Sequence, residues 1–535
     1  MRKLIFGTII FILLSTCKLI EGDLKLPPLE DNIHVTEVTF TENSKNLVLR
    51  NLYKNNVALV MVNTSSSKVD ADQTFGEPLP YANIPMRSNT ATENRIIGHP
   101  VATRYHATPS IISDNRYLLR SPSSLAASNT IGDKHDFWVE SVFQSGNFIQ
   151  REAVLQAIGE HCKVWVIPNT DYSKTITRTQ GETLAQKFDI IYPAETNLLG
   201  YEFGGGPNGS GGRDGDPKIQ ILVYDIGKYY GGYFWGKDYL TQPQLDAEGK
   251  GRKTNNAEMF YIGAELTNTY PDFIYSSLIH EFQHMINFNI KKIKNNITYK
   301  EWYDEMLSMM AEDVISSKIG IGTSSSGHVI QQRIQGVLYY YFLTGITEWL
   351  GDYFKEGEAI EEEFDYNIFY SLKYAYGAYL LRNYGGAAIL KEIISNNLVN
   401  EASITAALNK AYGSGFDFQY TLKRFGEAFI YSGPLPRGAM SFDKTVTSTI
   451  NGTAYTSYGF DIWKIQNPYP SAEYNMHDYF KSYGPFICPL DYWADRPRHS
   501  VFLFSHENFM NMTGDILITL YRPKNPNIKY LLMVF

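Results

Sequence analysis

Two histidines and one acid lie within five positions of each other in the stretch PDFIYSSLIHEFQHMINFN, residues 271–289. His280 and His284 are four positions apart, so on a helix they lie one turn apart on the same face. Two imidazoles placed in this way can bind one zinc ion at about 2.0–2.1 Å from each ring. Glu281 points about 100° away from them, so we expect it to act as the general base on a water beside the metal.

This geometry requires the stretch to be a helix. Pro271 suits the first turn of a helix, and no Gly or Pro follows it until after the motif. Three polar groups on a buried helix need partners, and a metal ion with its water would provide them. The alternative is a pair of histidines that hydrogen-bond to the backbone. The apolar residues that predict burial of this helix are Ile274, Leu278, Phe282, Met285 and Ile286.

A catalytic zinc usually has three protein ligands and one open position, and the third ligand is expected on the next helix. The stretch EWYDEMLSMMAEDVI, residues 301–315, is predicted to be a buried helix on which Glu305, Ser308 and Glu312 share one face. We expect Glu305 to be the third ligand. Glu301 is the alternative, although an acid at a helix start is also favoured by the helix dipole. Glu312 is expected to orient one of the histidines.

Together the two stretches resemble the gluzincin metallopeptidases, which combine HExxH with a downstream Glu. The closer similarity is to the hyicolysin family of secreted bacterial neutral metalloproteases, and it extends to GGGPNGSGGRDGDPKIQILVYDI and GGYFWGKD upstream of the motif. The resemblance implies a zincin-like core with a mixed sheet, an active-site helix and a helical subdomain. It also implies zinc at His280, His284 and Glu305, with Glu281 catalytic.

Further features follow from the same resemblance. Gluzincin aminopeptidases have a Tyr that stabilises the oxyanion, three residues before a Gly at the start of a later helix. The stretch YAYGAYLLRNYGG assigns this role to Tyr374, with Tyr376 as the alternative. An edge strand that pairs with the peptide substrate is expected at AEMFYIGAE, residues 257–265. Met306 departs from the family, because gluzincins commonly have Gly after the ligand Glu. His328 follows GTSSSG and is interpreted as a surface histidine.

The length of 535 residues suggests about two to four domains. Short runs of β-branched residues predict strands near both ends of the chain, for example NVALVMVN and SVFLFS, whereas the middle has helical periodicity. We therefore expect an α+β multidomain protein. Its parts are an N-terminal β-rich domain or pro-segment at 18–130, a zincin-like metallopeptidase domain at 131–435 and a C-terminal β-rich domain at 436–535.

The N-terminus has the pattern of an export signal. The basic MRK precedes the apolar LIFGTIIFILLST, which is too short to span a bilayer comfortably. A signal peptide is expected at residues 1–17, because LLSTC is similar to the bacterial lipoprotein signal and would place a lipid on Cys17. Thr16 departs from that signal, and the alternatives are a secretory peptide cut near Gly22 or an uncleaved anchor. The expected location is extracellular, or lipid-anchored at the bacterial cell surface or outer membrane.

Composition excludes some classes of function. A net charge of −8 argues against nucleic-acid binding, and three Cys cannot form a Cys-based zinc site. Cys162 and Cys488 form either one long-range disulfide or, in the preferred interpretation, two buried free thiols. The Gly-rich stretch before KIQILVYDI lacks the Lys-Ser/Thr of a phosphate-binding loop. Asp214 and Asp216 within it are too few ligands to claim a calcium ion.

These observations favour an exported zinc endopeptidase that acts on protein or peptide substrates. An aminopeptidase would need a carboxylate for the substrate amine, and the chain has no GxMEN-like motif for it. The alternative function is a surface lipoprotein that binds host or matrix polymers and carries a non-catalytic zinc site. A purely structural zinc site has no need for an acid at Glu281.

Overall fold

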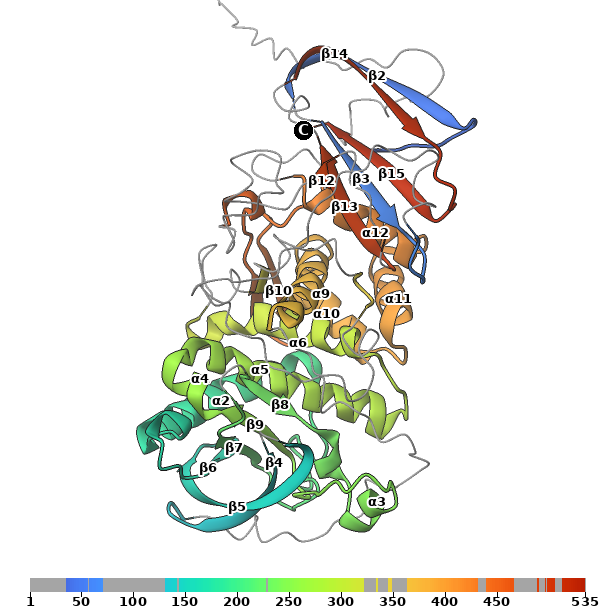
Figure 1. Ribbon diagram of the computed structural model, residues 1–535. Coiled ribbons are helices and arrows are strands. Elements are labelled where there is room, and N and C mark those ends of the chain that lie inside the picture. Colours follow the sequence, from blue (N-terminus) through green and yellow to red (C-terminus); the bar gives the residue numbers. More distant parts are fainter. Residues whose placement is uncertain are drawn as a thin grey trace, which may run out of the picture.

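The structure is a computed structural model that describes residues 35–70 and 130–534, with internal gaps. The longer gaps are 322–332, 335–344, 349–362, 432–438, 466–487, 490–495 and 506–511. Three parts lie along the long axis of the molecule: a curled sheet with its helices, a central group of helices, and a β unit at the opposite end (Figure 1). The predicted α+β multidomain class is confirmed.

The curled sheet has the strand order β4-β5-β6-β7-β9-β8. Neighbouring strands are antiparallel except for the parallel pairs β6–β7 and β7–β9. Helices cover one face, and a cluster that includes Phe137, Trp165 and Tyr261 fills the inside of the curl, so β6, β7 and β9 are buried throughout. The strands are β4 (Lys134–Ser141), β5 (Gln144–Ile158), β6 (Cys162–Val166), β7 (Ile219–Tyr224), β8 (Gly232–Phe234) and β9 (Met259–Gly263).

Three helices link this sheet to the rest of the protein. α2 (Arg178–Leu199) starts at a capping box and packs with α5 (Pro271–Asn287) on the sheet. α5 begins at Pro271, as predicted, and continues into the π-helix η5 (Phe288–Lys294). α6 (Glu301–Ile315) coincides with the second predicted helix and packs along α5 (Figure 1).

Shorter elements and further helices complete the middle of the chain. α9 packs against α6, and α12 lies next to the β unit. The helices are η3 (Tyr172–Lys174), η4 (Gly236–Tyr239), α3 (Gln242–Asp246), α4 (Ala264–Thr269), η6 (Ser316–Ile319), α9 (Glu363–Asn383), α10 (Ala387–Ser395), α11 (Asn400–Tyr412), α12 (Phe418–Ala428) and η9 (Ile462–Lys464). The hairpin β10 (Val446–Ile450) and β11 (Thr453–Ser457) packs on α10 and α6.

The expected substrate-pairing strand at residues 257–265 is not an edge. β9, which occupies this stretch, lies between β7 and β8 and pairs with both. Its backbone groups are therefore used on both sides. β8 is the edge strand at this end of the described sheet, so it takes over the expected position.

The N-terminal and C-terminal β-rich parts are expected as two flanking domains. In the structure, strands of the two parts pair with each other in common sheets. Sheet order β1-β15-β3-β13-β12 places β3 in the centre, and β2 pairs with β14. Cleavage at residue 130 that removed a pro-segment would therefore also remove the central strand of this sheet. The strands are β1 (Val35–Glu37), β2 (Ser44–Asn55), β3 (Val57–Asn63), β12 (Cys488–Pro489), β13 (Ser500–Ser505), β14 (Met512–Tyr521) and β15 (Ile528–Val534).

Two further expectations can be compared with the described residues. Cys162 carries a buried free thiol rather than a disulfide, which agrees with the preferred interpretation. Burial raises the pKa of this thiol, so it stays protonated. Among the described helices, none combines the length and apolar character needed to cross a bilayer. Residues 1–34, with Cys17, lie outside the described part of the chain.

The first prediction concerns the shared sheet. Val60 is fully buried and is paired with Leu531 of β15 and Leu503 of β13. Val60→Asp leaves an unpaired charge between the two C-terminal strands, so we expect it to cost about 3–5 kcal/mol of unfolding free energy. Denaturant unfolding and proteolysis of the region after residue 500 measure this loss. Ser66→Asp, in an exposed turn, is the control, and equal stability of the two variants would contradict the shared core.

Candidate metal centre

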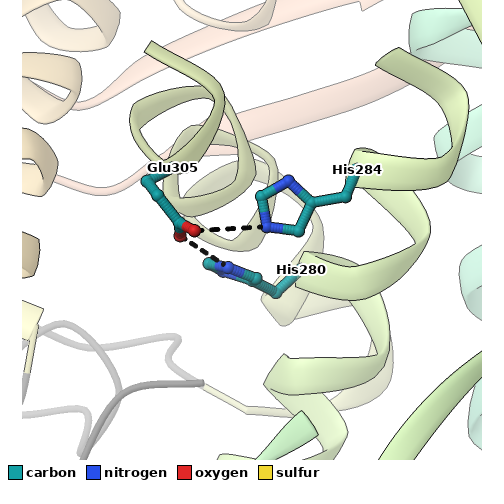
Figure 2. A group of neighbouring side chains, drawn as sticks. All are labelled: His280, His284 and Glu305. Carbon is teal, nitrogen blue, oxygen red and sulfur yellow. Dashed lines mark hydrogen bonds and ion pairs between the residues drawn. The ribbon is translucent and has the colours of Figure 1, made fainter. Parts of the chain in front are cut away.

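The structure brings His280 and His284 of α5 together with Glu305 of α6 (Figure 2). One ligand atom from each of the three lies within 4.8 Å of the others. Oε2 of Glu305 is 3.0 Å from Nε2 of His280, and Oε1 is 3.7 Å from Nε2 of His284. All three side chains are fully buried. Glu305, rather than Glu301, completes this group.

The donor set fits zinc. Ligands about 2.0–2.1 Å from a tetrahedral zinc lie about 3.4 Å from one another, which falls between the two observed contacts of 3.0 and 3.7 Å. Burial lowers the pKa of His284, so the ring stays neutral as a metal ligand requires. Burial also raises the pKa of Glu305 to about 8. A bound cation would therefore favour the ionised form of this carboxylate.

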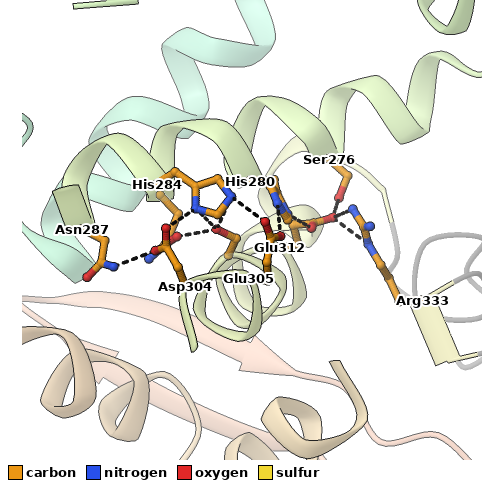
Figure 3. Close-up of polar contacts among 10 residues, drawn as sticks. Ser276, His280, His284, Asn287, Asp304, Glu305, Glu312 and Arg333 are labelled. Atoms are coloured by element: carbon orange, nitrogen blue, oxygen red, sulfur yellow. Dashed lines mark hydrogen bonds and ion pairs between the residues drawn. The ribbon is translucent and has the colours of Figure 1, made fainter. Parts of the chain in front are cut away.

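Each histidine ring is held by a second carboxylate (Figure 3). Nδ1 of His280 lies 2.7 Å from Oε1 of Glu312, and Nδ1 of His284 lies 2.9 Å from Oδ2 of Asp304. The Nδ1–H group of each ring donates to one of these acids. Both Nε2 atoms therefore face Glu305 with a lone pair that can bind a metal. Glu312 thus makes the contact with a histidine that its position on the helix predicts.

Asp304 was not identified from the sequence. It directly precedes Glu305, and helical periodicity places the two about 100° apart, so spacing gives no reason to link Asp304 with a histidine. In the structure Nδ2 of Asn287 donates to Oδ1 of Asp304 at 2.6 Å, which fixes the carboxylate toward His284 (Figure 3). Ser308 contacts the same ring and donates to Gln283.

The negative charge of Glu312 is compensated by an arginine from a distant segment of the chain. Arg333 donates to its Oε2 through Nε at 3.1 Å and through Nη2, and the hydroxyl of Ser276 donates to the same oxygen (Figure 3). Burial raises the pKa of Glu312 well above its ordinary value and lowers that of Arg333 to about 9. The fork of donors favours the ionised carboxylate that orients His280. No spacing in the sequence connects Arg333 to this site.

Glu281 is fully buried next to the ligands but is not one of them. Neither of its carboxylate oxygens makes a hydrogen bond of ordinary geometry within the described residues. Burial, and next the nearby Glu312, raise its pKa well above the ordinary value, and the backbone N–H of Phe234 offsets this only in part. The side chain lies against β8, because a Cβ on Gly232 would be 3.2 Å from Cγ of Glu281.

The candidate oxyanion tyrosines have other partners. The hydroxyl of Tyr374 donates to Asp313 at 2.7 Å, and Asp313 is paired with Arg382 at 2.9 Å. The hydroxyl of Tyr376 lies 2.6 Å from that of Thr421. The structure therefore does not bring either hydroxyl onto the histidines. The ring of Tyr370, one turn before Tyr374 on α9, lies 6.4 Å from the ring of His280.

Met306, which stands where gluzincins commonly have Gly, does not disturb the helix that carries Glu305. α6 is continuous, and Met306 is fully buried within it. A Cβ on Gly377 of α9 would lie 3.3 Å from Cγ of Met306 and 2.6 Å from Cγ of Met310. The small residue is thus on the facing helix, where it allows α9 to approach the two methionines. His328 lies outside the described residues.

The second prediction tests how the rings are held. Asp304→Asn weakens the acceptor for Nδ1 of His284, so we expect about 10–100-fold lower affinity for zinc. Competition with a zinc-binding dye, on folded protein, measures the affinity. Glu301→Gln changes an acid on the same helix outside the metal group and should stay within about two-fold of the unaltered chain. Unchanged affinity in Asp304→Asn would show that the contact does not support metal binding.

Comparison with known proteins finds a similarity to a metalloprotease over about half of this chain. The chain is 29% identical over 279 residues to the neutral metalloprotease ShpI of Staphylococcus hyicus. The match covers 48% of this chain and 54% of the relative, so the chain spans about half the length of the protein it matches. No protein-family profile matches the chain. The buried group of His280, His284 and Glu305, which could hold a metal ion, agrees with this similarity.

Proposed function

We propose that this chain is an exported zinc endopeptidase of the gluzincin type, related to the hyicolysins. The observation that carries the proposal is the buried group of two imidazoles and one carboxylate, with the unused carboxylate of Glu281 next to it. A surface lipoprotein with a purely structural zinc would have no use for that buried acid, which costs stability. The similarity to a neutral metalloprotease also supports a peptidase.

In this proposal His280, His284 and Glu305 hold the ion. Zinc supplies Lewis acidity, which makes water a nucleophile near neutral pH and polarises a peptide carbonyl. Glu281 accepts the proton of the attacking water and returns it to the leaving amine. Burial raises its pKa, which favours the protonated form that donates to the leaving amine, whereas a bound cation would favour the ionised form that accepts the first proton.

Substrate binding is proposed at β8. An extended peptide can add to an exposed sheet edge through backbone hydrogen bonds, and β8 is the edge strand next to Glu281. A peptide paired with Gly232–Phe234 would run past the general base. Such pairing needs no free N-terminus, which favours an endopeptidase over an aminopeptidase. Cleavage of a peptide with an acetylated N-terminus distinguishes the two.

Export and retention of the N-terminal segment complete the proposal. The basic and apolar pattern of residues 1–17 supports export, with lipidation of Cys17 as its finer form. We propose that residues 35–70 stay with the mature protein, because β3 pairs with both β13 and β15. Mass spectrometry of the exported form tests both points.

The third prediction tests the general base. Glu281→Gln removes the proton acceptor and keeps the ligands, so we expect casein hydrolysis to fall at least about 10³-fold while about one zinc per chain is retained. Activity and metal content are measured on the same preparation, with and without a chelator. Asp272→Asn, an exposed acid on the same helix, should hydrolyse casein normally. Full activity in Glu281→Gln, or an unaltered chain that binds no zinc, would refute the proposed function.

The fourth prediction concerns the oxyanion donor, for which Tyr374 remains our proposal. Loss of one such donor should lower kcat by about 10²–10³-fold with little change in KM. Tyr374→Phe also breaks the contact with Asp313, so thermal unfolding is measured in parallel. Tyr370→Phe is the matched comparison from the same helix. A kcat loss confined to Tyr370→Phe would move the role to Tyr370 and overturn the assignment of Tyr374.

A further inference from the structure

The β unit meets the central helices where β13 packs on α12 (Figure 1). Arg498 and His499, which directly precede β13, also contact the buried segment 345–348. The backbone N–H of Ile346 donates to the carbonyl of His499 at 3.1 Å. Nη2 of Arg498 donates to the carbonyl of Thr347 at 2.8 Å. The β unit is therefore joined to a segment from the middle of the chain by hydrogen bonds to its backbone.

A glycine and a left-handed histidine show how closely the two segments fit. A Cβ on Gly345 would overlap the carbonyl oxygen of Arg498, so only glycine allows the two backbones to approach this closely. His499 has a φ of 48°, in the left-handed region that other residues than glycine rarely adopt. Such a backbone costs free energy and persists where the surrounding contacts fix it. The contacts at this corner thus determine where the His499 ring lies.

The His499 ring is buried against partners from two other segments. Its Nδ1 lies 2.7 Å from the hydroxyl of Thr347, and its ring packs edge-on against Phe418 of α12, with the ring centroids 5.0 Å apart. Burial, and next the charges of Arg498 and Lys300, lower the pKa of His499 to about 4. The ring is therefore neutral at neutral pH, and it packs on Phe418 as an uncharged aromatic side chain.

Phe418 also contacts the helix that carries Glu305. The ring of Phe418 lies 6.3 Å from that of Trp302, the second residue of α6. Trp302 is three positions before Glu305 and only 1% exposed. The backbone N–H of Lys300, which precedes α6, donates to Oδ1 of Asn400 in α11 at 2.9 Å. The start of α6 is therefore fixed by α11 and by the Phe418 ring.

A second contact connects the same corner with α9. Nζ of Lys373 donates to the carbonyl of Gly345 at 3.0 Å, and Lys373 is fully buried. Tyr370 lies three positions earlier on α9, and its ring is 6.4 Å from that of His280. The segment at Gly345 and the ring of His499 thus lie against the two helices, α6 and α9, that border the metal group from the side opposite the curled sheet.

We propose that His499 is a positioning residue for the metal centre. Through the rings of Phe418 and Trp302 it holds the start of α6. The start of α6 sets where Asp304 and Glu305 lie relative to the histidines of α5. The β unit, which strands from both ends of the chain build, thereby supports metal binding. This inference rests on the proposed zinc site but not on the proposed peptidase activity.

The first test measures zinc affinity by dye competition on the folded full chain. His499→Asn tolerates the left-handed backbone and keeps a polar partner for Thr347, but it removes the ring that packs on Phe418. We expect the affinity for zinc to fall about 3–30-fold. On casein, kcat should fall with it while KM stays within about two-fold, because β8, where the substrate is proposed to bind, belongs to the curled sheet.

A control and a double variant separate positioning from general stability. Lys423→Ala removes the pair of Lys423 with Glu37, at 2.7 Å, which joins α12 to the β unit away from the three rings, so zinc affinity should stay within about two-fold. Phe418→Leu should weaken zinc binding as His499→Asn does, and the two changes together should cost no more than either alone. Additive losses, or an equal loss in Lys423→Ala, would overturn the proposal.

The unaltered chain provides a test that needs no variant. Coupling between two sites is reciprocal, so zinc must stabilise this corner if the corner supports zinc binding. Amide hydrogen exchange at 345–348 and 498–500 should slow at least about three-fold when zinc is added, and more than exchange in β4. Equal slowing in both regions would overturn the proposal.

The outcomes also separate this inference from the proposed function. Normal casein hydrolysis together with unchanged zinc affinity in His499→Asn would refute the inference and leave the peptidase in place. Zinc binding that depends on His499, in a chain that does not hydrolyse casein, would refute the peptidase and support the positioning role.

Discussion

The interior between α5 and α6 must accommodate more negative charge than a protein core ordinarily holds. Burying a carboxylate without compensation is costly, and removing a partner from a buried pair costs several kcal/mol. Three of the acids contact a specific side chain: Glu312 accepts from Arg333, Asp304 accepts from the amide of Asn287, and Glu305 contacts His280. The four acids are Glu281, Asp304, Glu305 and Glu312, and all are at most 1% exposed.

The compensation is unequal, and this inequality gives the site its chemistry. Glu312 and Asp304 accept from rings and from other side chains, so they are fixed as orienting groups. Glu305 faces two imidazole nitrogens whose lone pairs point the same way. One divalent cation could bind the carboxylate and both nitrogens. Among the described residues, Glu281 has only the nearby backbone N–H of Phe234 in β8. A weakly held acid next to a metal site is suited to exchange protons.

The surrounding fold holds this charged layer between packed elements. The curled sheet supports α5 from one side, and Gly232 of β8 permits close approach to Glu281. α9 supports α6 from the other side through Gly377. At the far end, strands from both termini form one sheet against α12, where Gly426 packs on Val60 and Val501. The two ends of the chain thus stabilise the helical part together.

The sequence by itself determined the two helices and the metal-ligand pattern, because these depend on local periodicity. The spacing of His280 and His284 and the acids one helix later follow from 3.6 residues per turn. Contacts between distant segments were decided only by tertiary structure, since no spacing encodes them. Arg333 on Glu312, the hydroxyl of Tyr374 on Asp313, the edge position of β8 and the pairing of β3 with β13 and β15 are of this kind. Each depends on which surfaces meet when the chain is packed, and a linear pattern of residue types does not specify that.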